Sequence, residues 1–105
     1  MAQYVEIEIT QGNINNEHLY LSSVIDFFPK ESIGGGNVRE AARRTLEVHN
    51  GLGDPIATDI AGDKKIFRKR SWVGDFFRAH DIREGDRVVI EKTGPSRYHV
   101  YPKRG

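Results

Sequence analysis

Seven short stretches of this 105-residue chain show the hydrophobic pattern of β-strands. Val5–Ile9 alternates apolar and acidic side chains, which is the period of two expected when one strand face is buried. The other expected strands are Leu19–Leu21, Thr45–His49, Ile56–Ile60, Ile66–Arg70, Arg87–Lys92 and Tyr98–Tyr101. Turn residues such as Asn50-Gly51 and Thr93-Gly94-Pro95 separate these stretches.

Two further segments carry helical signals. Ser23 opens an S-x-x-D capping pattern that predicts a short helix through Phe28. Aromatic residues then recur at helical spacing after the basic stretch and predict a second helix with a buried face: Trp72, Phe76, Phe77 and His80. Seven strands, two short helices and no internal repeat predict a mainly β (α+β) fold, barrel-like and closed at its ends by helices.

Size and composition favour one domain over residues 1–105. The chain is 37% hydrophobic and 30% charged, and a chain of this length buries roughly two-thirds of its unfolded surface, enough for one core. It has no cysteine, which excludes disulfides and thiolate metal sites. No apolar run approaches a membrane span and no signal-peptide core is present, so we expect a cytoplasmic protein without a membrane partner.

The net charge is only +1, but the basic residues are concentrated. Five of them fall in one short segment: Lys64, Lys65, Arg68, Lys69 and Arg70. Such local concentration suits a nucleic-acid reader better than an indiscriminate polyanion binder. The alternation of Ile66, Arg68 and Arg70 predicts both arginines on one strand face, where guanidinium groups match phosphate or the guanine O6/N7 edge. Alternatively, the run is a solvated edge strand, since lysines on edges discourage aggregation.

The segment from Gln11 to His18 is polar and rich in amides, which predicts a loop or protruding arm. Amide side chains pair with the N6 and N7 atoms of adenine, so four residues are candidate base readers: Gln11, Asn13, Asn15 and Asn16. His18 borders this segment and is a candidate phosphate contact. The alternative is that these are ordinary turn residues, because asparagine is common in turns.

The three consecutive glycines Gly34–Gly36 lack the Lys-Ser/Thr of a phosphate-binding loop. A flexible connector is the better interpretation. Arg39, Arg43 and Arg44 follow it, and Arg43 in particular is a candidate contact to the DNA backbone.

Catalytic and metal-binding patterns are weak. The four histidines, His18, His49, His80 and His99, lie in different elements without metal-ligand spacing. Asp59 followed by Lys64-Lys65 faintly resembles a nuclease pattern, but a magnesium nuclease needs convergent carboxylates. We therefore expect no catalytic residue, no metal, no cofactor and no DNA cleavage by the isolated chain.

Two motifs carry a resemblance to a known family: HLYLSSVIDFF and SWVGDFFRAHDIREGDRVVIE. The second joins a Trp, a helical Phe pair, an acidic-Gly-Asp turn and an apolar strand. The chain resembles the B3 DNA-binding domain of plant transcription factors and, more closely, the effector-binding domains of certain prokaryotic restriction endonucleases. The resemblance extends over nearly the whole chain, with a core from about residue 4 to residue 101.

This resemblance implies a seven-stranded open β-pseudobarrel that grips the DNA major groove between two arms, here Gln11–His18 and Ala61–Arg70. The restriction relatives usually carry a nuclease as well, and no catalytic domain fits in this chain. We expect a sequence-preferring, double-stranded DNA-binding module of a restriction-modification or regulatory system, nucleoid-associated when bound, with a nuclease or methyltransferase subunit as a possible partner. Two alternatives stay open: a domain or subunit of a DNA-cleaving or DNA-modifying enzyme, and a protein-interaction barrel with an incidental basic edge.

Overall fold

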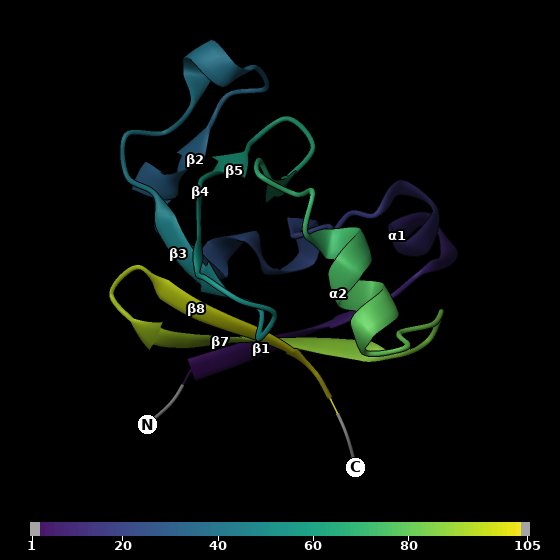
Figure 1. Cartoon of the computed structure of the whole chain (residues 1–105). Helices are drawn as coiled ribbons and strands as arrows, with labels where there is room; N and C mark the ends of the chain where they lie inside the picture. Colours follow the sequence, from purple (N-terminus) through teal and green to yellow (C-terminus); the bar gives the residue numbers. More distant parts are fainter. Residues whose placement is uncertain (1–2, 104–105) are drawn as a thin grey trace.

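The computed structural model describes residues 3–103 and folds them into a mostly β, α+β architecture of two sheets (Figure 1). The eight strands within this range are β1 (Gln3–Glu8), β2 (Ile33–Gly34), β3 (Leu46–His49), β4 (Ile56–Thr58), β5 (Ile60–Ala61), β6 (Ile66–Phe67), β7 (Arg87–Gly94) and β8 (Arg97–Pro102). The helices are α1 (Gln11–Asn16), α2 (Val73–Ala79) and three short 3₁₀ helices, η1 (Ser22–Phe27), η2 (Lys30–Ser32) and η3 (Val38–Glu40). No helix in the described range combines the length and apolarity needed to cross a membrane.

The larger sheet has five strands in the order β1-β7-β8-β3-β4, and the smaller sheet has three in the order β2-β5-β6. β7 and β8 form an antiparallel hairpin with an irregularity between Lys92 and Gly94, whereas β3 runs parallel to β8. The small sheet lies at the top of the view in Figure 1, away from β1, β7, β8 and both ends of the chain. The mainly β fold is confirmed, but eight strands in two sheets replace the expected seven.

The stretch expected as one strand, Ile56–Ile60, is divided between the two sheets. β4 ends at Thr58 and β5 begins at Ile60, so Asp59 is the residue at which the chain changes sheet. Its carboxylate accepts a hydrogen bond from the Ala42 backbone amide at 2.7 Å, and its carbonyl accepts one from the Thr58 hydroxyl at 2.9 Å. These bonds to Asp59 explain the break, which strand alternation alone does not reveal.

Three other expected elements also differ. The expected strand Leu19–Leu21 is reduced to a single bridge between Tyr20 and Ile66. The basic strand ends at Phe67 rather than at Arg70, because Arg68 turns toward Asp59 (described below). The helix expected from Ser23 forms, but as the 3₁₀ helix η1. Each difference depends on a tertiary contact or on the tightness of a short helix, neither of which periodicity specifies.

The aromatic face of α2 lies in the core, as the sequence predicted. Trp72 is 8% exposed, and Phe76 and Phe77 are also buried. The ring of Trp72 lies 6.0 Å from those of Phe67 and Phe76, and its indole N–H donates to the Lys69 carbonyl at 2.8 Å. Trp72 therefore joins the end of the basic segment to the core through both packing and a satisfied polar atom.

Replacing Trp72 with alanine should destabilise the fold by about 3–5 kcal/mol, the usual loss when a large buried aromatic side chain is removed. The measurement is urea unfolding followed by circular dichroism, since Trp72 is the only tryptophan and its removal abolishes the fluorescence probe. Tyr4→Ala is the matched control, because Tyr4 is 60% exposed. Equal stabilities for the two variants would contradict the assigned role of Trp72.

Candidate nucleic-acid interface

The turn between β5 and β6, residues 62–65, carries the first two cations of the basic segment. Lys65 adopts a left-handed conformation with φ of 54°, and its backbone N–H donates to the Ala61 carbonyl at 2.8 Å. The Lys65 carbonyl in turn accepts from the backbone N–H of Leu21 at 2.7 Å. The turn is thus fixed at both of its sides, and the Lys64 side chain is exposed at its tip. We call β5, β6 and this turn the basic hairpin.

The segment expected as an amide-rich loop is helical over most of its length. The Thr10 side chain accepts from the Asn13 backbone N–H, and the Asn13 side chain accepts from the Thr10 backbone N–H, which together form a capping box. The Asn13 amide also donates to the His18 carbonyl at 2.8 Å, and Asn13 is only 2% exposed. The structure therefore gives Asn13 a capping role instead of the expected place among the base readers, and Glu17 ends the helix in a left-handed conformation.

The other three amides of α1 are exposed. Gln11 and Asn15 stand one helical turn apart, and the Gln11 amide donates to the Asn15 side-chain oxygen at 2.8 Å. The Asn16 amide donates to the Tyr20 hydroxyl at 3.0 Å. These bonds restrict how the amides point while leaving donors and acceptors available to a ligand.

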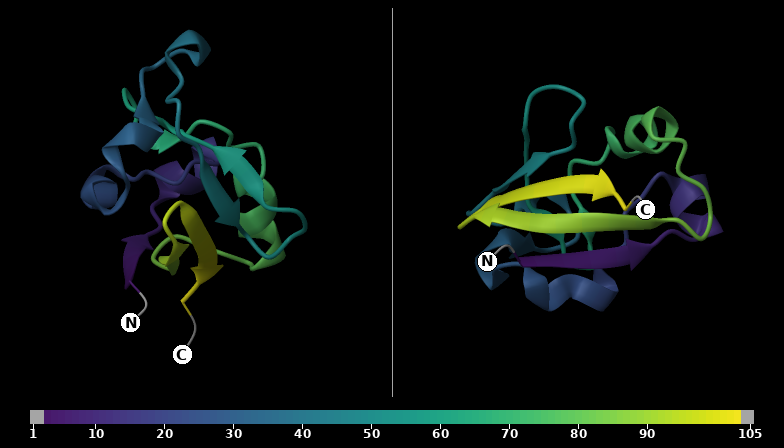
Figure 2. Two further views of the ribbon diagram at one scale, coloured as in Figure 1. Left: turned by 90° about the vertical axis from the view of Figure 1, so that its left-hand side faces the viewer. Right: turned by 90° about the horizontal axis from the view of Figure 1, so that it is seen from below.

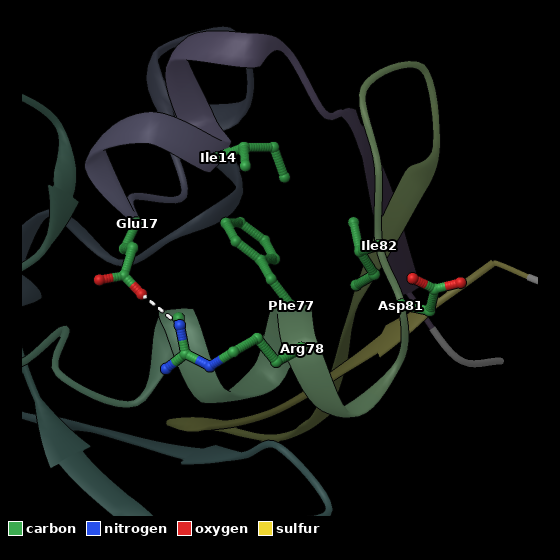
Figure 3. A pocket seen from close by; sticks show the side chains of 7 residues that line it. Ile14, Glu17, Phe77, Arg78, Asp81 and Ile82 are labelled. Atoms are coloured by element: carbon green, nitrogen blue, oxygen red, sulfur yellow. Dashed lines mark hydrogen bonds and ion pairs between the residues drawn. The ribbon is translucent and has the colours of Figure 1, made fainter.

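Figure 3 shows how α1 rests on α2 across a shallow hollow of about 280 Å³. Ile14, Phe77 and Ile82 line this hollow, and the Glu17 carboxylate pairs with Arg78 at 3.1 Å on one side of it. Gly74 also lines the hollow, and any side chain there would strike the Glu17 carboxylate. Ile14 of α1 packs against the core, and the Glu17–Arg78 ion pair links the end of α1 to α2.

The two predicted arms meet at His18 and Tyr20. Tyr20 bridges to Ile66 of the basic hairpin, and the His18 ring packs edge-on against Tyr20 with centroids 5.6 Å apart. Burial, followed by the nearby charges of Arg70 and Lys64, lowers the pKa of His18 and thereby favours the neutral imidazole. Its Nδ1 atom is buried without a hydrogen-bond partner. Tyr20 was not among the residues selected from the sequence, although it lies inside the HLYLSS motif.

The Arg68 side chain does not lie beside that of Arg70 on an open strand face, contrary to the sequence-based expectation. Its guanidinium forms an ion pair with Asp59, with Nε 2.7 Å from Oδ1 and Nη2 3.1 Å from Oδ2. It also donates to the carbonyls of Gly35 at 2.7 Å and Asn37 at 3.0 Å. The Arg68 side chain is 16% exposed and that of Asp59 only 5%. Arg68 is therefore held inside the fold, whereas Arg70 is exposed.

The glycine segment expected as a flexible connector is tightly bound. Gly34 belongs to β2, its carbonyl accepts from the Gly62 backbone N–H at 2.9 Å, and Gly35 donates to the Glu40 carbonyl at 2.8 Å. A Cβ atom on Gly34 would collide with the backbone of Glu40 and Ala42. Glycine is needed here for close backbone approach rather than for flexibility.

The cations of residues 3–103 fall into two groups. Seven form ion pairs with carboxylates: Arg44, Arg68, Arg78, Arg83, Arg87, Arg97 and Lys103. Eight form no ion pair within this range: Lys30, Arg39, Arg43, Lys64, Lys65, Lys69, Arg70 and Lys92. Six of these eight lie in two segments, 39–43 and 64–70, that flank the small sheet. Positive charge without an internal counterion is therefore concentrated at the small sheet.

Within residues 3–103, no three or more His, Asp or Glu side chains are grouped so that they could hold a metal ion. Asp59, the acidic residue of the weak nuclease pattern, is bound to Arg68 and to the Ala42 amide. Its carboxylate is therefore used within the fold.

Comparison with known proteins leaves the function to be argued from this geometry. The chain matches no protein-family model and no curated protein sequence.

The Asp59–Arg68 pair should make stability depend on acid pH. Burial raises the pKa of Asp59, but the hydrogen bonds from Arg68 and Ala42 lower it by more than burial raises it. The folded-state pKa therefore lies below the unfolded value of about 3.9. A lowered pKa contributes stability that is fully present above about pH 4 and is lost as the pH falls through the folded-state value. Asp59→Asn combined with Arg68→Gln removes both charges and should reduce the stability lost between pH 7 and about pH 3.

Urea unfolding at a series of pH values measures this effect. Asp81→Asn is the control, because Asp81 forms only an exposed pair with Arg83 and should retain the wild-type pH profile. If the Asp59/Arg68 double variant also retains that profile, other carboxylates govern the acid sensitivity.

Proposed function

We propose that this chain is a double-stranded DNA-binding module with sequence preference. The observation that carries the proposal is the contact between the basic hairpin and the segment directly after the amide arm, made by the Leu21–Lys65 backbone hydrogen bond and the Tyr20–Ile66 bridge. Next to this contact, the exposed Asn16 amide donates to the Tyr20 hydroxyl, and the charges of Lys64 and Arg70 act on the His18 ring, so amide and cationic side chains occur on both sides of it. Amides suit base edges and cations suit phosphates, so the combination suits DNA better than a protein partner or a small metabolite.

The two kinds of side chain have different tasks in this proposal. The phosphate contacts come from the exposed cations Lys64, Lys69 and Arg70 and the half-buried Lys65, with Arg43 as a further contact. Base readout comes from Gln11, Asn15 and Asn16 on α1. His18 lies between the two groups, and Asn13 and Arg68 support the backbone without touching DNA. α1 and the basic hairpin then act as two arms in the major groove.

A B3-like open pseudobarrel is the architecture that we propose for the two sheets. The resemblance implies one arm between the first two strands and the other between the fourth and fifth. The amide arm follows β1, and the basic arm joins β5 to β6 because the expected strand Ile56–Ile60 is divided into β4 and β5. We further propose that the module works in the cytoplasm on nucleoid DNA, within a restriction-modification or regulatory system. Strand cleavage or base modification would then belong to a separate nuclease or methyltransferase subunit.

Lys64→Ala and Lys65→Ala should each weaken binding to selected and random duplexes alike. Every phosphate neutralised by a protein cation contributes about −0.9 to the slope of log affinity against log salt concentration. Each substitution should therefore flatten that slope by roughly one unit, as measured by fluorescence anisotropy across a salt titration. Arg83→Ala is the control, since Arg83 is an exposed cation that is paired with Asp81. An unchanged slope in the lysine variants would support the edge-strand alternative.

Asn15→Ala and Asn16→Ala should instead leave the salt slope unchanged and reduce discrimination between sequences. A lost bidentate amide–base pair costs about 1–3 kcal/mol at the base pair concerned. The measurement compares each variant on the duplex selected by the wild type and on single base-pair replacements of it. Gln3→Ala serves as the amide control, because Gln3 is exposed on β1 in the other sheet. Uniform weakening on every duplex would contradict base readout by α1.

A further inference from the structure

The loop of residues 35–44, which contains η3 and which we call the η3 loop, carries two of the unpaired cations, Arg39 and Arg43. In Figures 1 and 2 it projects from the small sheet next to the turn of the basic hairpin, on the side away from both chain ends. Within residues 3–103, the exposed side chains of Arg39 and Arg43 form no hydrogen bond or ion pair. The η3 loop is therefore a protruding, positively charged element beside the candidate interface.

The η3 loop is fastened to the basic hairpin along its length. Arg68, which directly follows β6, donates to the carbonyls of Gly35 and Asn37. Asp59, which precedes β5, accepts from the Ala42 amide at the other end of the loop. A Cβ atom on Gly36 would touch the Asp63 side chain, so the loop lies directly against the hairpin turn. Together these contacts join the two segments into one unit.

The tip of the loop is itself ordered by a second capping box. The Asn37 side chain accepts from the Arg39 backbone N–H at 3.0 Å, and the Asn37 backbone N–H donates to the Glu40 carboxylate at 3.4 Å. A loop fixed at its base and at its tip presents its cations without a large ordering cost on binding. The backbone that carries Arg39 is thus ordered before any ligand arrives.

We propose that the η3 loop is a third DNA-contacting arm, in which Arg39 and Arg43 bind phosphates, and that Arg68 is the positioning residue that holds this arm beside the basic hairpin. The inference rests on the proposed DNA-binding function. Arginine suits the task because its planar guanidinium offers paired donors to phosphate oxygens. The duplex then spans from α1 across the basic hairpin to the η3 loop, so the contact region is wider than the two arms alone provide.

A positioning residue and a phosphate contact differ in how their effects combine. If Arg68 touched DNA itself, its loss would add to the loss of Arg39 and Arg43. If Arg68 acts by holding the loop, removing it already removes both loop contacts, so the further loss of Arg39 and Arg43 changes nothing more. The salt slope is the suitable readout because it counts neutralised phosphates rather than stability.

The experiment compares the salt slope of four proteins on one random duplex: the wild type, Arg39→Ala/Arg43→Ala, Asp59→Asn/Arg68→Gln, and all four substitutions together. The first variant should flatten the slope by roughly two units, at about 0.9 per phosphate. The second should flatten it by a similar amount, and the fourfold variant by no more than either pair alone. Asp59 is changed together with Arg68 so that no buried charge is left unpaired.

Gly34→Ala tests the same idea without altering any charge. Its new Cβ would collide with the backbone of Glu40 and Ala42 and displace the η3 loop, so it should flatten the salt slope as the Arg39/Arg43 pair does. It also serves as the second route if the Asp59/Arg68 variant fails to fold. Arg83→Ala/Arg97→Ala is the charge-matched control and should leave the slope unchanged, because both arginines are paired with carboxylates elsewhere.

The outcomes separate this inference from the function on which it rests. A wild type without salt-dependent DNA binding overturns both. A slope that responds to Lys64→Ala but not to the Arg39/Arg43 pair overturns the third arm alone. Additive effects of the two double variants overturn the positioning role, because Arg68 would then contact phosphate directly.

Discussion

The buried ion pair between Asp59 and Arg68 is the interaction on which the arrangement around the smaller sheet depends. It lies where the chain crosses from the larger sheet to the smaller one. A buried ion pair stabilises a fold only weakly by its charge alone, because both groups lose their hydration. Here the pair also satisfies the Ala42 amide and the carbonyls of Gly35 and Asn37. Its main effect is therefore to fix a geometry, in which three separate segments meet around one guanidinium group.

Charged side chains are paired differently on the two sheets. On the larger sheet, cations such as Arg87 and Arg97 are neutralised by glutamates on neighbouring strands. Around the smaller sheet the exposed cations have no such partners within residues 3–103, and the best-paired arginine of that region, Arg68, is turned inward. A near-neutral protein thereby acquires one side suited to a polyanion and another side suited to solvent.

Local signals in the sequence predicted much of the fold and part of the site. The alternation of Val5–Ile9 and the aromatic spacing of α2 correspond to β1 and to the buried Trp72, because these patterns depend on neighbours within one element. The local structure of the two candidate arms is harder to predict from the sequence. α1 depends on a capping box that turns an asparagine-rich segment into a helix. Arg68 depends on partners up to 33 positions away in the chain, which alternation along one strand does not register.

The order of strands in the larger sheet has a consequence for how the chain assembles. Within residues 3–103, β1 is the strand nearest the N-terminus, yet its partner is β7, and β3 pairs with β8, the strand nearest the C-terminus. Such non-local pairings give a high contact order and slow the folding. The chain must lose the entropy of closing long loops before the stabilising contacts can form. During synthesis on a ribosome, β1 emerges long before β7, so its apolar face stays without its pairing strand until β7 has also emerged. Meanwhile the local hairpin of β7 and β8 can form as soon as it is made, and it then serves as the template on which the earlier strands dock.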